Sequence, residues 1–358
     1  MTLPALRRLR EAHPRARITL VTPEKLNDLW SGSPFLDETL PVAPGESVWS
    51  VGRRIRERRY DAGLILPNSP RTALELWLGN VPRRVGRQGS WRRLLLTEVA
   101  PQPPEFTAMR KRDVAEIKRL VAANGAPPPP PHAGAHQIFH YLHLAAALGA
   151  SPSPVAPFIP VSLEEAKQTG AELGIPLREG GAPVLGLVAG AEYGPAKRWP
   201  VENFIAAARE LRRQTGCVWV LLGGPGDRAV AAEIERALAE GGAGATAGAV
   251  VNLAGKTSLR QLCGVMRLCR VVLTNDTGPM HLAAAVGTPV VALFGGTSPE
   301  LTGPGLPGDP RHRLLRVPTP CSPCFVRECP VDHRCLRGLT PERVAAEVRA
   351  VLSRGVKP

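Results

Sequence analysis

The sequence predicts an α/β protein of two domains in which strands alternate with helices. Short apolar runs and amphipathic helical segments alternate through both halves of the chain, an order typical of parallel βαβ units. Prolines gather in residues 151–160, where the alternation stops before it starts again, as expected of a linker. We therefore expect one domain in residues 1–160 and a second in residues 161–340. Residues 341–358 are expected to form a final helix, with packing back on the first domain as an option.

Hydrophobic spacing gives the order of elements in the first half. Helices are expected at residues 3–13, 48–59, 71–78 and 136–148, and strands at residues 17–21, 62–66 and 84–86. The proline run at 127–131 excludes a helix or an inner strand there and predicts an exposed, extended loop.

The second half repeats the alternation. Helices are expected at residues 163–173, 201–215, 229–240 and 259–268, and strands at residues 184–188, 218–222, 250–253, 271–273 and 289–294. Because parallel strands end at one edge of a sheet, the loops that follow them converge, and ligands bind there. A cleft between two such domains is the other usual ligand site.

The chain is strongly basic, with a net charge of +14. Residues 1–160 carry 22 basic and 13 acidic side chains, so most of the excess lies in the first domain. An anionic substrate, an anionic membrane face and nucleic acid all fit this charge, and an arginine-rich composition without such a partner is the alternative. Aromatic residues make up only 4% of the chain and do not alternate with basic ones, so we expect no nucleic acid.

No stretch has the length of a membrane span, which requires about 18 apolar residues. The basic residues Arg7, Arg8 and Arg10 are not followed by the apolar core of a signal peptide. We therefore expect a cytoplasmic protein.

The most informative stretch is TNDTGPMHLAAA at residues 274–285, which lies between two apolar runs. It predicts a polar turn after a strand and then a helix, whose first N–H groups and dipole attract phosphate. Asp276 and Thr277 precede the helix, and His281 falls one turn later on the side of Thr277. The stretch favours a phosphate or nucleotide-sugar site, with a plain helix cap as the alternative.

Two other loops follow strands of the same domain. Lys197 and Arg198 precede a helix, and since cations oppose the dipole of a helix start, a phosphate ligand is expected there. In the GGPGD loop at 223–227, Gly224 lets a ligand approach the backbone and Asp227 can accept hydrogen bonds from a ribose. Taken alone, the loop with Lys197 and Arg198 also fits a solvated basic turn. The loop at 223–227 also fits a tight turn with Asp227 as the helix N-cap. Together the three loops favour a site for a nucleotide diphosphate.

These loops resemble the second domain of the bacterial lipopolysaccharide heptosyltransferases, a glycosyltransferase family of the GT-B type. The matching stretches are residues 196–200, 223–228 and 274–289, with 66–69 and 83–86 in the first domain. The resemblance covers nearly the whole chain and is closest to the heptosyltransferases II, which add the second heptose of the inner core. It implies two Rossmann-like, doubly wound domains that face a cleft.

The resemblance also implies a reaction and the residues that perform it. The family transfers L-glycero-D-manno-heptose from ADP-heptose to a sugar hydroxyl, with inversion and without a required metal or cofactor. Lys197 and Asp276 match the catalytic positions, because cationic groups stabilise the leaving diphosphate. The donor-binding candidates are Lys197, Arg198, Gly224, Asp227, Asp276, Thr277, Gly278 and His281.

The family begins with a strand and a glycine-rich turn that holds its proposed general base, an aspartate. Residues 1–6 of this chain resemble the interior of the helix that follows, so the resemblance implies that the strand and the aspartate lie upstream of Met1. A missing general base costs about 10²–10⁴ in rate, so slow turnover is expected. A catalytically silent nucleotide-sugar-binding protein is therefore one alternative function, and another nucleotide-sugar transferase of the same fold is the second.

In the GT-B arrangement the first domain faces the acceptor, here the inner core of lipopolysaccharide. Asn68, Ser69 and Arg71 follow a strand and are the acceptor-binding candidates. The many arginines of this domain are expected to attract the anionic acceptor in a salt-sensitive way, with solvated helix faces as the alternative. The same basic surface can hold the protein peripherally at the inner membrane.

Four of the seven cysteines crowd into one segment, at Cys321, Cys324, Cys329 and Cys335. In a cytosolic protein such spacing is more typical of a metal site than of disulfides. A structural zinc site is one interpretation, and reduced cysteines that pack a loop are the other.

Overall fold

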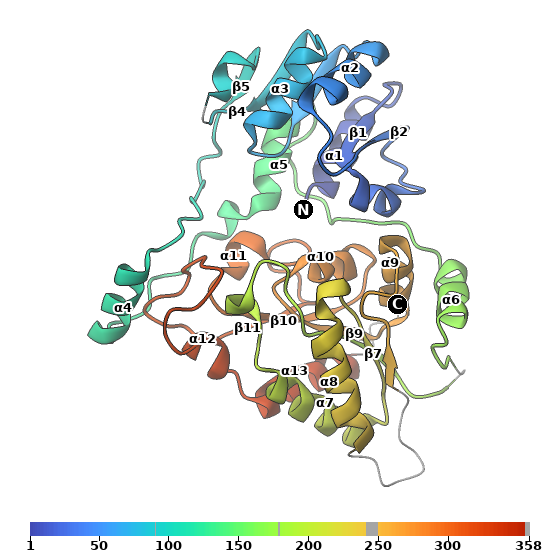
Figure 1. Ribbon diagram of the computed structural model, residues 1–358, viewed down its shortest axis with the longest axis vertical. Helices are drawn as coiled ribbons and strands as arrows, with labels where there is room; N and C mark the ends of the chain where they lie inside the picture. The colour runs from blue at the N-terminus through green and yellow to red at the C-terminus, as the bar shows by residue number, and fades with distance from the viewer. Residues whose placement is uncertain (90, 178–179, 241–249, 355–358) are drawn as a thin grey trace. The chain divides into compact units, whose positions relative to one another are not determined.

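The computed structural model describes residues 1–89, 91–177, 180–240 and 250–354. The chain divides into two compact units. The first comprises Met1–Thr107 and His132–Pro157, and the second comprises Ala108–Pro131 and Phe158–Pro358. Both units are built from parallel strands and helices (Figure 1).

The first unit contains two parallel sheets with helices on both faces. Its strands are β1 (Thr19–Pro23), β2 (Glu38–Val42), β3 (Ala62–Ile65), β4 (Arg83–Arg87) and β5 (Glu98–Ala100), paired as β1-β2 and β3-β4-β5. Its helices are α1 (Leu3–Ala12), α2 (Val48–Arg58), α3 (Pro70–Leu78) and α5 (Gln137–Ala146), with short 3₁₀ turns η1 (Glu24–Trp30), η2 (Arg92–Leu94) and η3 (Ala133–Ala135). Leu64 packs with α1 and α5, whereas the next residue, Ile65, packs with Ala73 of α3. The helices and strands expected in this half are present, and β2 and β5 are additional.

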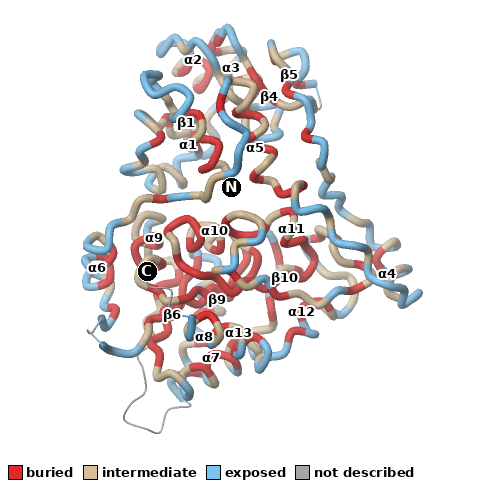
Figure 2. The backbone as a smooth tube through the Cα atoms, turned by 180° about the vertical axis from the view of Figure 1, so that it is seen from behind, coloured by how far each residue is buried: buried red, intermediate tan, exposed pale blue. Residues whose placement is uncertain are grey.

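The second unit is built on a six-stranded, all-parallel sheet with the order β11-β10-β9-β6-β7-β8. Its strands are β6 (Val184–Val188), β7 (Val218–Leu221), β8 (Val250–Asn252), β9 (Val271–Asn275), β10 (Val290–Phe294) and β11 (Arg313–Arg316). Every residue of β6, β9 and β10 is buried, as Figure 2 shows in red. Such runs are apolar throughout because helices cover both faces of a parallel sheet.

The helices of the second unit follow local signals in the sequence. They are α4 (Val114–Ala123), α6 (Leu163–Glu172), α7 (Val201–Thr215), α8 (Arg228–Glu240), α9 (Leu259–Leu268), α10 (Gly278–Ala285), α11 (Pro299–Thr302), α12 (Arg334–Arg337) and α13 (Pro341–Ser353). Ser258 and Gln261 form a capping box that begins α9, and Gly216 ends α7 in the left-handed conformation. Both helices have the predicted bounds. No helix in the described ranges is long and apolar enough to cross a membrane.

The C-terminal helix belongs to the second unit. Val344, Ala345, Val348 and Val351 of α13 lie in the same buried cluster as Phe204 of α7. The apolar stripe of α13 is therefore covered within the second unit.

Residues 108–131 also belong to the second unit, although the sequence analysis placed them in the first domain. Ile117 of α4 is buried against Ala196, Cys324 and their neighbours. The backbone N–H of Arg112 donates to Cys324 O at 3.0 Å, and its guanidinium donates to Pro323 O. These contacts are long-range in sequence, so hydrophobic spacing alone did not indicate them. The proline run at 127–131 has no regular secondary structure, as predicted.

Candidate active site

The candidate site lies at the carboxyl edge of the large sheet, where β6, β9 and β10 end. These three strands are neighbours and run parallel. The loops that leave them, at residues 189–200, 276–278 and 295–298, therefore start from the same edge. This is the edge at which open α/β sheets bind ligands.

A buried ion pair joins two of these loops. Asp276 is 4% exposed, and its Oδ2 accepts a hydrogen bond from Lys197 Nζ at 2.7 Å. The same oxygen accepts a second bond from Thr297 Oγ1 at 2.6 Å. All three loops thus meet at one carboxylate oxygen. The arrangement fixes a lysine ammonium, largely removed from water, at the end of the sheet.

Asn275, the last residue of β9, locks the loop that carries the lysine. Its side chain is fully buried, and Oδ1 accepts from the backbone N–H of Trp199 at 3.0 Å. Its Nδ2 donates to Ala189 O at 2.7 Å. The amide therefore ties both ends of the 189–199 loop to β9, and the position of Lys197 follows from this anchor.

A segment near residue 326 clamps the lysine loop from the other side. Tyr193 donates its hydroxyl to Phe325 O at 2.8 Å, and Arg327 Nε donates to Tyr193 O at 2.8 Å. The Tyr193 ring lies 5.3 Å from Lys197 Nζ and 5.8 Å from Arg327 Cζ, measured from its centroid. A Cβ on Gly194 would overlap the Arg327 carbonyl oxygen, so only glycine permits this approach. The site thereby gains a second cation that the sequence analysis did not select.

The start of α10 faces the same edge. Thr277 occupies the cap position in an extended conformation, and its side chain makes no cap hydrogen bond. Nothing lies within 4 Å of a Cβ built on Gly278, so space is open at the first turn. His281 is half-buried one turn later. Since a helix start carries partial positive charge, this opening suits an anion.

Asp227 shapes its own loop. Its Oδ2 accepts from the backbone N–H of Gly224 at 2.9 Å. A Cβ on Gly190 or Gly223 would collide with the Asp227 carboxylate, which explains both glycines by close approach. Asp227 therefore lies at the ends of β6 and β7. Its Oδ2 is already used by the hydrogen bond from Gly224 within the 223–227 loop. Arg198 is exposed and donates to Ala191 O at 3.2 Å.

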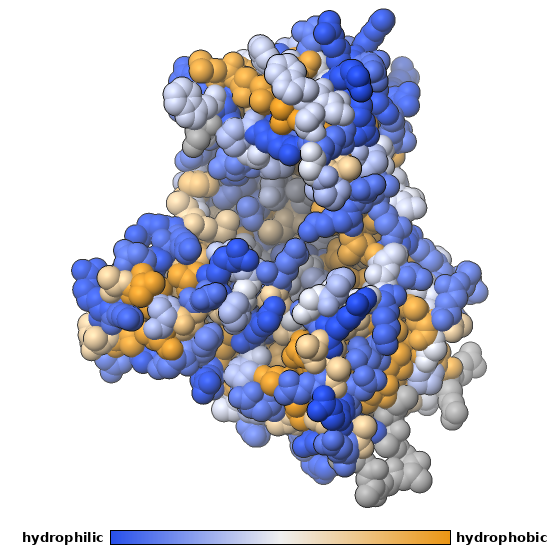
Figure 3. Space-filling model, viewed as in Figure 1, coloured by the Kyte–Doolittle hydropathy of each residue, from blue (hydrophilic) through white to orange (hydrophobic). Residues whose placement is uncertain are grey.

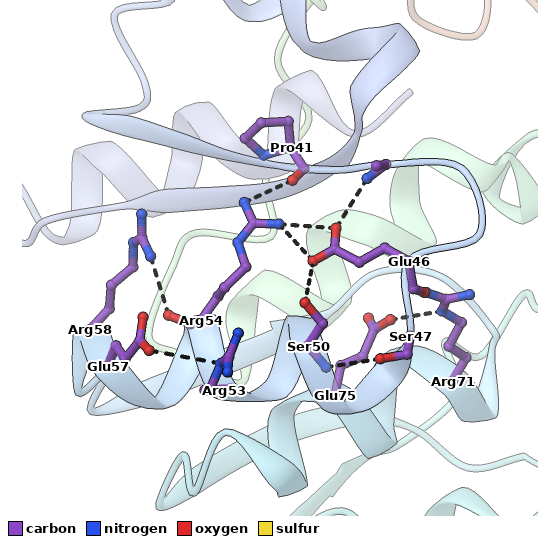
Figure 4. Close-up of polar contacts among 11 residues, drawn as sticks. Pro41, Glu46, Ser47, Ser50, Arg53, Arg54, Glu57, Arg58, Arg71 and Glu75 are labelled. Atoms are coloured by element: carbon purple, nitrogen blue, oxygen red, sulfur yellow. Dashed lines mark hydrogen bonds and ion pairs between the residues drawn. The ribbon is translucent and has the colours of Figure 1, made fainter.

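The acceptor-site candidates lie in the first unit, after β3. Figure 4 shows Arg71 directed at Glu75, with Nε 2.8 Å from Glu75 Oε1. Arg71 also donates to the backbone oxygen of Glu46. Arg71 thus forms an ion pair with a residue four positions along the same helix, while its side chain stays 45% exposed. Ser69 caps α3 without a side-chain cap bond, and Asn68 Oδ1 lies beside Gly89.

A buried arginine holds the loop of Asn68 and Ser69. Arg92 is 1% exposed and donates to Pro67 O at 2.7 Å and to Arg87 O. The Arg87 guanidinium lies 3.4 Å from His140 Nδ1, and burial, followed by Arg87, lowers the pKa of His140. Among the described residues, Arg92 Nε and His140 Nε2 have no hydrogen-bond partner. This edge of the first unit is therefore rich in cations and N–H donors.

The cysteine segment had two interpretations, a structural zinc site and reduced cysteines that pack a loop. In the described parts of the chain, no three His, Cys, Asp or Glu side chains are placed to hold one metal ion. Cys321 and Cys324 instead pack with Ile117, Ala196 and Val326, and all seven cysteines are free. Burial raises the pKa of the Cys335 thiol to about 12. Cys329 packs against the same cluster as Cys321 and Cys324.

The structure thus brings Lys197 and Asp276 into direct contact, and Thr277 and Gly278 follow Asp276 in the chain. Three further residues of the site were not selected from the sequence: Asn275, Thr297 and Arg327. Asn275 lies within residues 274–285, and its place at the end of a strand could have marked it as a site residue. Thr297 and Arg327 are distant in sequence and carried no such signal.

Comparison with known proteins identifies the family. The sequence profile of glycosyltransferase family 9 (heptosyltransferase) matches residues 48–334. Lipopolysaccharide heptosyltransferase 2 of Salmonella typhimurium is 30% identical over 356 residues, covering 97% of this chain and 93% of the relative. The structure of E. coli ADP-heptose LPS heptosyltransferase II has a TM-score of 0.75 and 27% identity, with 99% and 94% of the two chains covered. An E. coli heptosyltransferase solved with ADP shares the fold at a TM-score of 0.66 and 19% identity, over 98% and 95% of the chains. The chain therefore belongs to glycosyltransferase family 9 and is a heptosyltransferase.

Proposed function

We propose that this chain transfers L-glycero-D-manno-heptose from ADP-heptose to the inner core of lipopolysaccharide, with inversion. The observation that carries the proposal is the Lys197 ammonium, fixed by Asp276 at the ends of β6 and β9 beside the start of α10. A fixed cation and a helix start together stabilise the negative charge that develops on a leaving diphosphate. ADP-heptose in the name of one relative and ADP in the structure of another support this donor.

The proposed division of labour follows from the geometry. Lys197 neutralises the leaving ADP, while Asp276 and Thr297 hold its ammonium in place. The backbone at Thr277 and Gly278 binds a phosphate, and His281 lies near the sugar. Arg198, Gly224 and Asp227 are proposed on the nucleoside side. Because these groups supply the positive charge, the proposed chemistry requires no metal or cofactor.

The first unit is proposed to bind the acceptor. Asn68 and Ser69 are the candidates for its sugar hydroxyls, and their loop is held by Arg92. Arg71 pairs with Glu75 through Nε, and its side chain is 45% exposed, so the exposed part of its guanidinium is proposed to meet an anionic group of the acceptor. Because the lipopolysaccharide core is built on a lipid anchor, the proposal includes peripheral contact with the cytoplasmic face of the inner membrane, and no nucleic acid.

Calorimetric titration with ADP and with adenosine tests the role of the lysine. Lys197→Ala is expected to weaken ADP binding by about tenfold or more and to leave adenosine binding unchanged, because only ADP carries the diphosphate. Lys167→Ala is the control, since this lysine lies on α6 of the same unit and is exposed. Equal ADP affinity of the Lys197→Ala variant and the unaltered chain would count against the proposed site.

A further inference from the structure

Arg327 is fixed against the loop that carries Lys197. Its carbonyl oxygen accepts a hydrogen bond from the backbone N–H of Ala196 at 3.0 Å. Its Nε donates to Tyr193 O at 2.8 Å, and Tyr193 in turn donates its hydroxyl to Phe325 O at 2.8 Å. These hydrogen bonds join the two segments from both directions, so they determine where the Arg327 guanidinium lies relative to Lys197.

Lys197 and Arg327 lie beside the same aromatic ring. Measured from the ring centroid of Tyr193, Lys197 Nζ lies at 5.3 Å and Arg327 Cζ at 5.8 Å. The negative face of an aromatic ring attracts a cation, so the ring helps to hold both positive charges in the site. Two like charges held near one another also repel, and an anion bound by both removes that repulsion. The arrangement therefore favours an anionic ligand.

The two cations differ in their pairing. Lys197 Nζ lies 2.7 Å from Asp276 Oδ2, so this pair carries no net charge. Arg327 is exposed and, in the part of the chain that the structure describes, forms no ion pair. Figure 3 shows hydrophilic side chains, in blue, over much of the second unit around α11 and α12. Arg327 therefore adds positive charge that no described carboxylate neutralises.

We propose that the Arg327 guanidinium binds the diphosphate of the donor together with Lys197 and supplies the net positive charge of the site. The inference rests on the proposed function, because it adds a residue to the same donor site. The bond to Tyr193 O uses only Nε, so the two terminal nitrogens of Arg327 remain for phosphate oxygens. A guanidinium suits this role because its paired N–H groups match the oxygens of a phosphate.

Calorimetric titration of the full chain with ADP and with adenosine tests the proposal. Arg327→Gln removes the charge and is expected to weaken ADP binding roughly tenfold, while adenosine binding stays unchanged. Arg327→Lys keeps the charge but not the paired donors, and about a threefold loss is expected. Because one cation fewer meets the diphosphate, the ADP affinity of Arg327→Gln should also depend less on salt than that of the unaltered chain.

Arg236→Gln is the matched control, since it removes an exposed arginine on α8 of the same unit and should leave ADP binding unchanged. An Arg327→Gln variant with undiminished ADP affinity, or with an undiminished salt dependence, would overturn the proposal. So would an Arg327→Lys variant that binds ADP no better than Arg327→Gln. A loss of ADP and adenosine binding by the same factor, with a lower melting temperature, would show that Arg327 only supports the loop, and would overturn it too.

Lys197→Ala separates this inference from the proposed function. If Lys197→Ala weakens ADP binding and Arg327→Gln does not, the Arg327 contact is refuted and the proposed donor site stands. If ADP binding depends on Arg327 but no heptose reaches a core acceptor, the proposed transfer is refuted and the Arg327 contact stands.

Discussion

Replacing Thr297 by valine tests how Lys197, the proposed catalytic lysine, is held. Thr297 is 6% exposed, and its hydroxyl donates to Asp276 Oδ2, the oxygen that also binds Lys197. Valine has nearly the same volume, so no cavity forms. A hydrogen bond to a charged group contributes about 1.5–3 kcal/mol, and we expect the free energy of unfolding of the second unit to fall by about this amount.

Thr288→Val is the matched control for this change. Thr288 is equally buried in the same unit, but its hydroxyl donates to a neutral acceptor, Met266 O, at 2.7 Å. A neutral bond is worth about half as much, so the control should cost about 0.5–1.5 kcal/mol. Urea unfolding followed by tryptophan fluorescence, to which the buried Trp199 and Trp219 of this unit contribute, measures both variants. A smaller loss for Thr297→Val than for Thr288→Val would refute the view that a charge-assisted bond fixes this carboxylate.

Three further predictions concern packing, pH and metal. Gly194→Ala should weaken ADP binding and lower the melting temperature, because the new methyl group overlaps the Arg327 carbonyl oxygen. Such overpacking costs about 1–3 kcal/mol. An unchanged melting curve would contradict the close packing of the Tyr193–Gly194 segment against Arg327. Burial lowers the pKa of His312 from 6.5 to about 4. Between these two pH values the unfolded chain binds a proton that the folded chain does not. The contribution of His312 to stability should therefore be complete above pH 6.5 and be lost as the pH falls to about 4. His312→Gln should flatten this acid limb in urea unfolding measured at several pH values, and a limb as steep as before would exclude His312 as its source. Turnover should survive a metal chelator, since Lys197 supplies the charge; a loss that added metal restores would show otherwise.

The sequence was sufficient for most of the elements, because their signals are local. The apolar runs at 184–188 and 271–273 lie in strands whose residues are all buried, and the cap at Ser258 and the glycine at 216 mark helix ends. The assignment of residues 108–131 to the second unit was out of reach, since it depends on where Ile117 finds apolar partners more than 70 residues away. The packing of α13 against α7 was out of reach for the same reason, because the two helices are distant in the sequence.

In the site, residue types and positions could be predicted but not their pairing. Lys197 and Asp276 were chosen separately, as residues on two loops 79 positions apart, and only the order of the parallel strands brings them together. Thr297 and Arg327 act through contacts that no spacing encodes. The engagement of Arg71 by Glu75 was accessible from the start, because four residues on a helix place the two charges side by side.

The central claim is that the ammonium held by Asp276 drives departure of ADP from ADP-heptose. Its most direct test is acceptor-dependent release of ADP from ADP-heptose, with a heptose-bearing core oligosaccharide and mass analysis of the product. We predict release above the enzyme-free control, addition of one heptose to the acceptor, and a loss of about 10²–10³ in rate for Lys197→Ala. A folded protein that binds ADP but adds no heptose, or a Lys197→Ala variant as fast as the unaltered chain, would contradict the account.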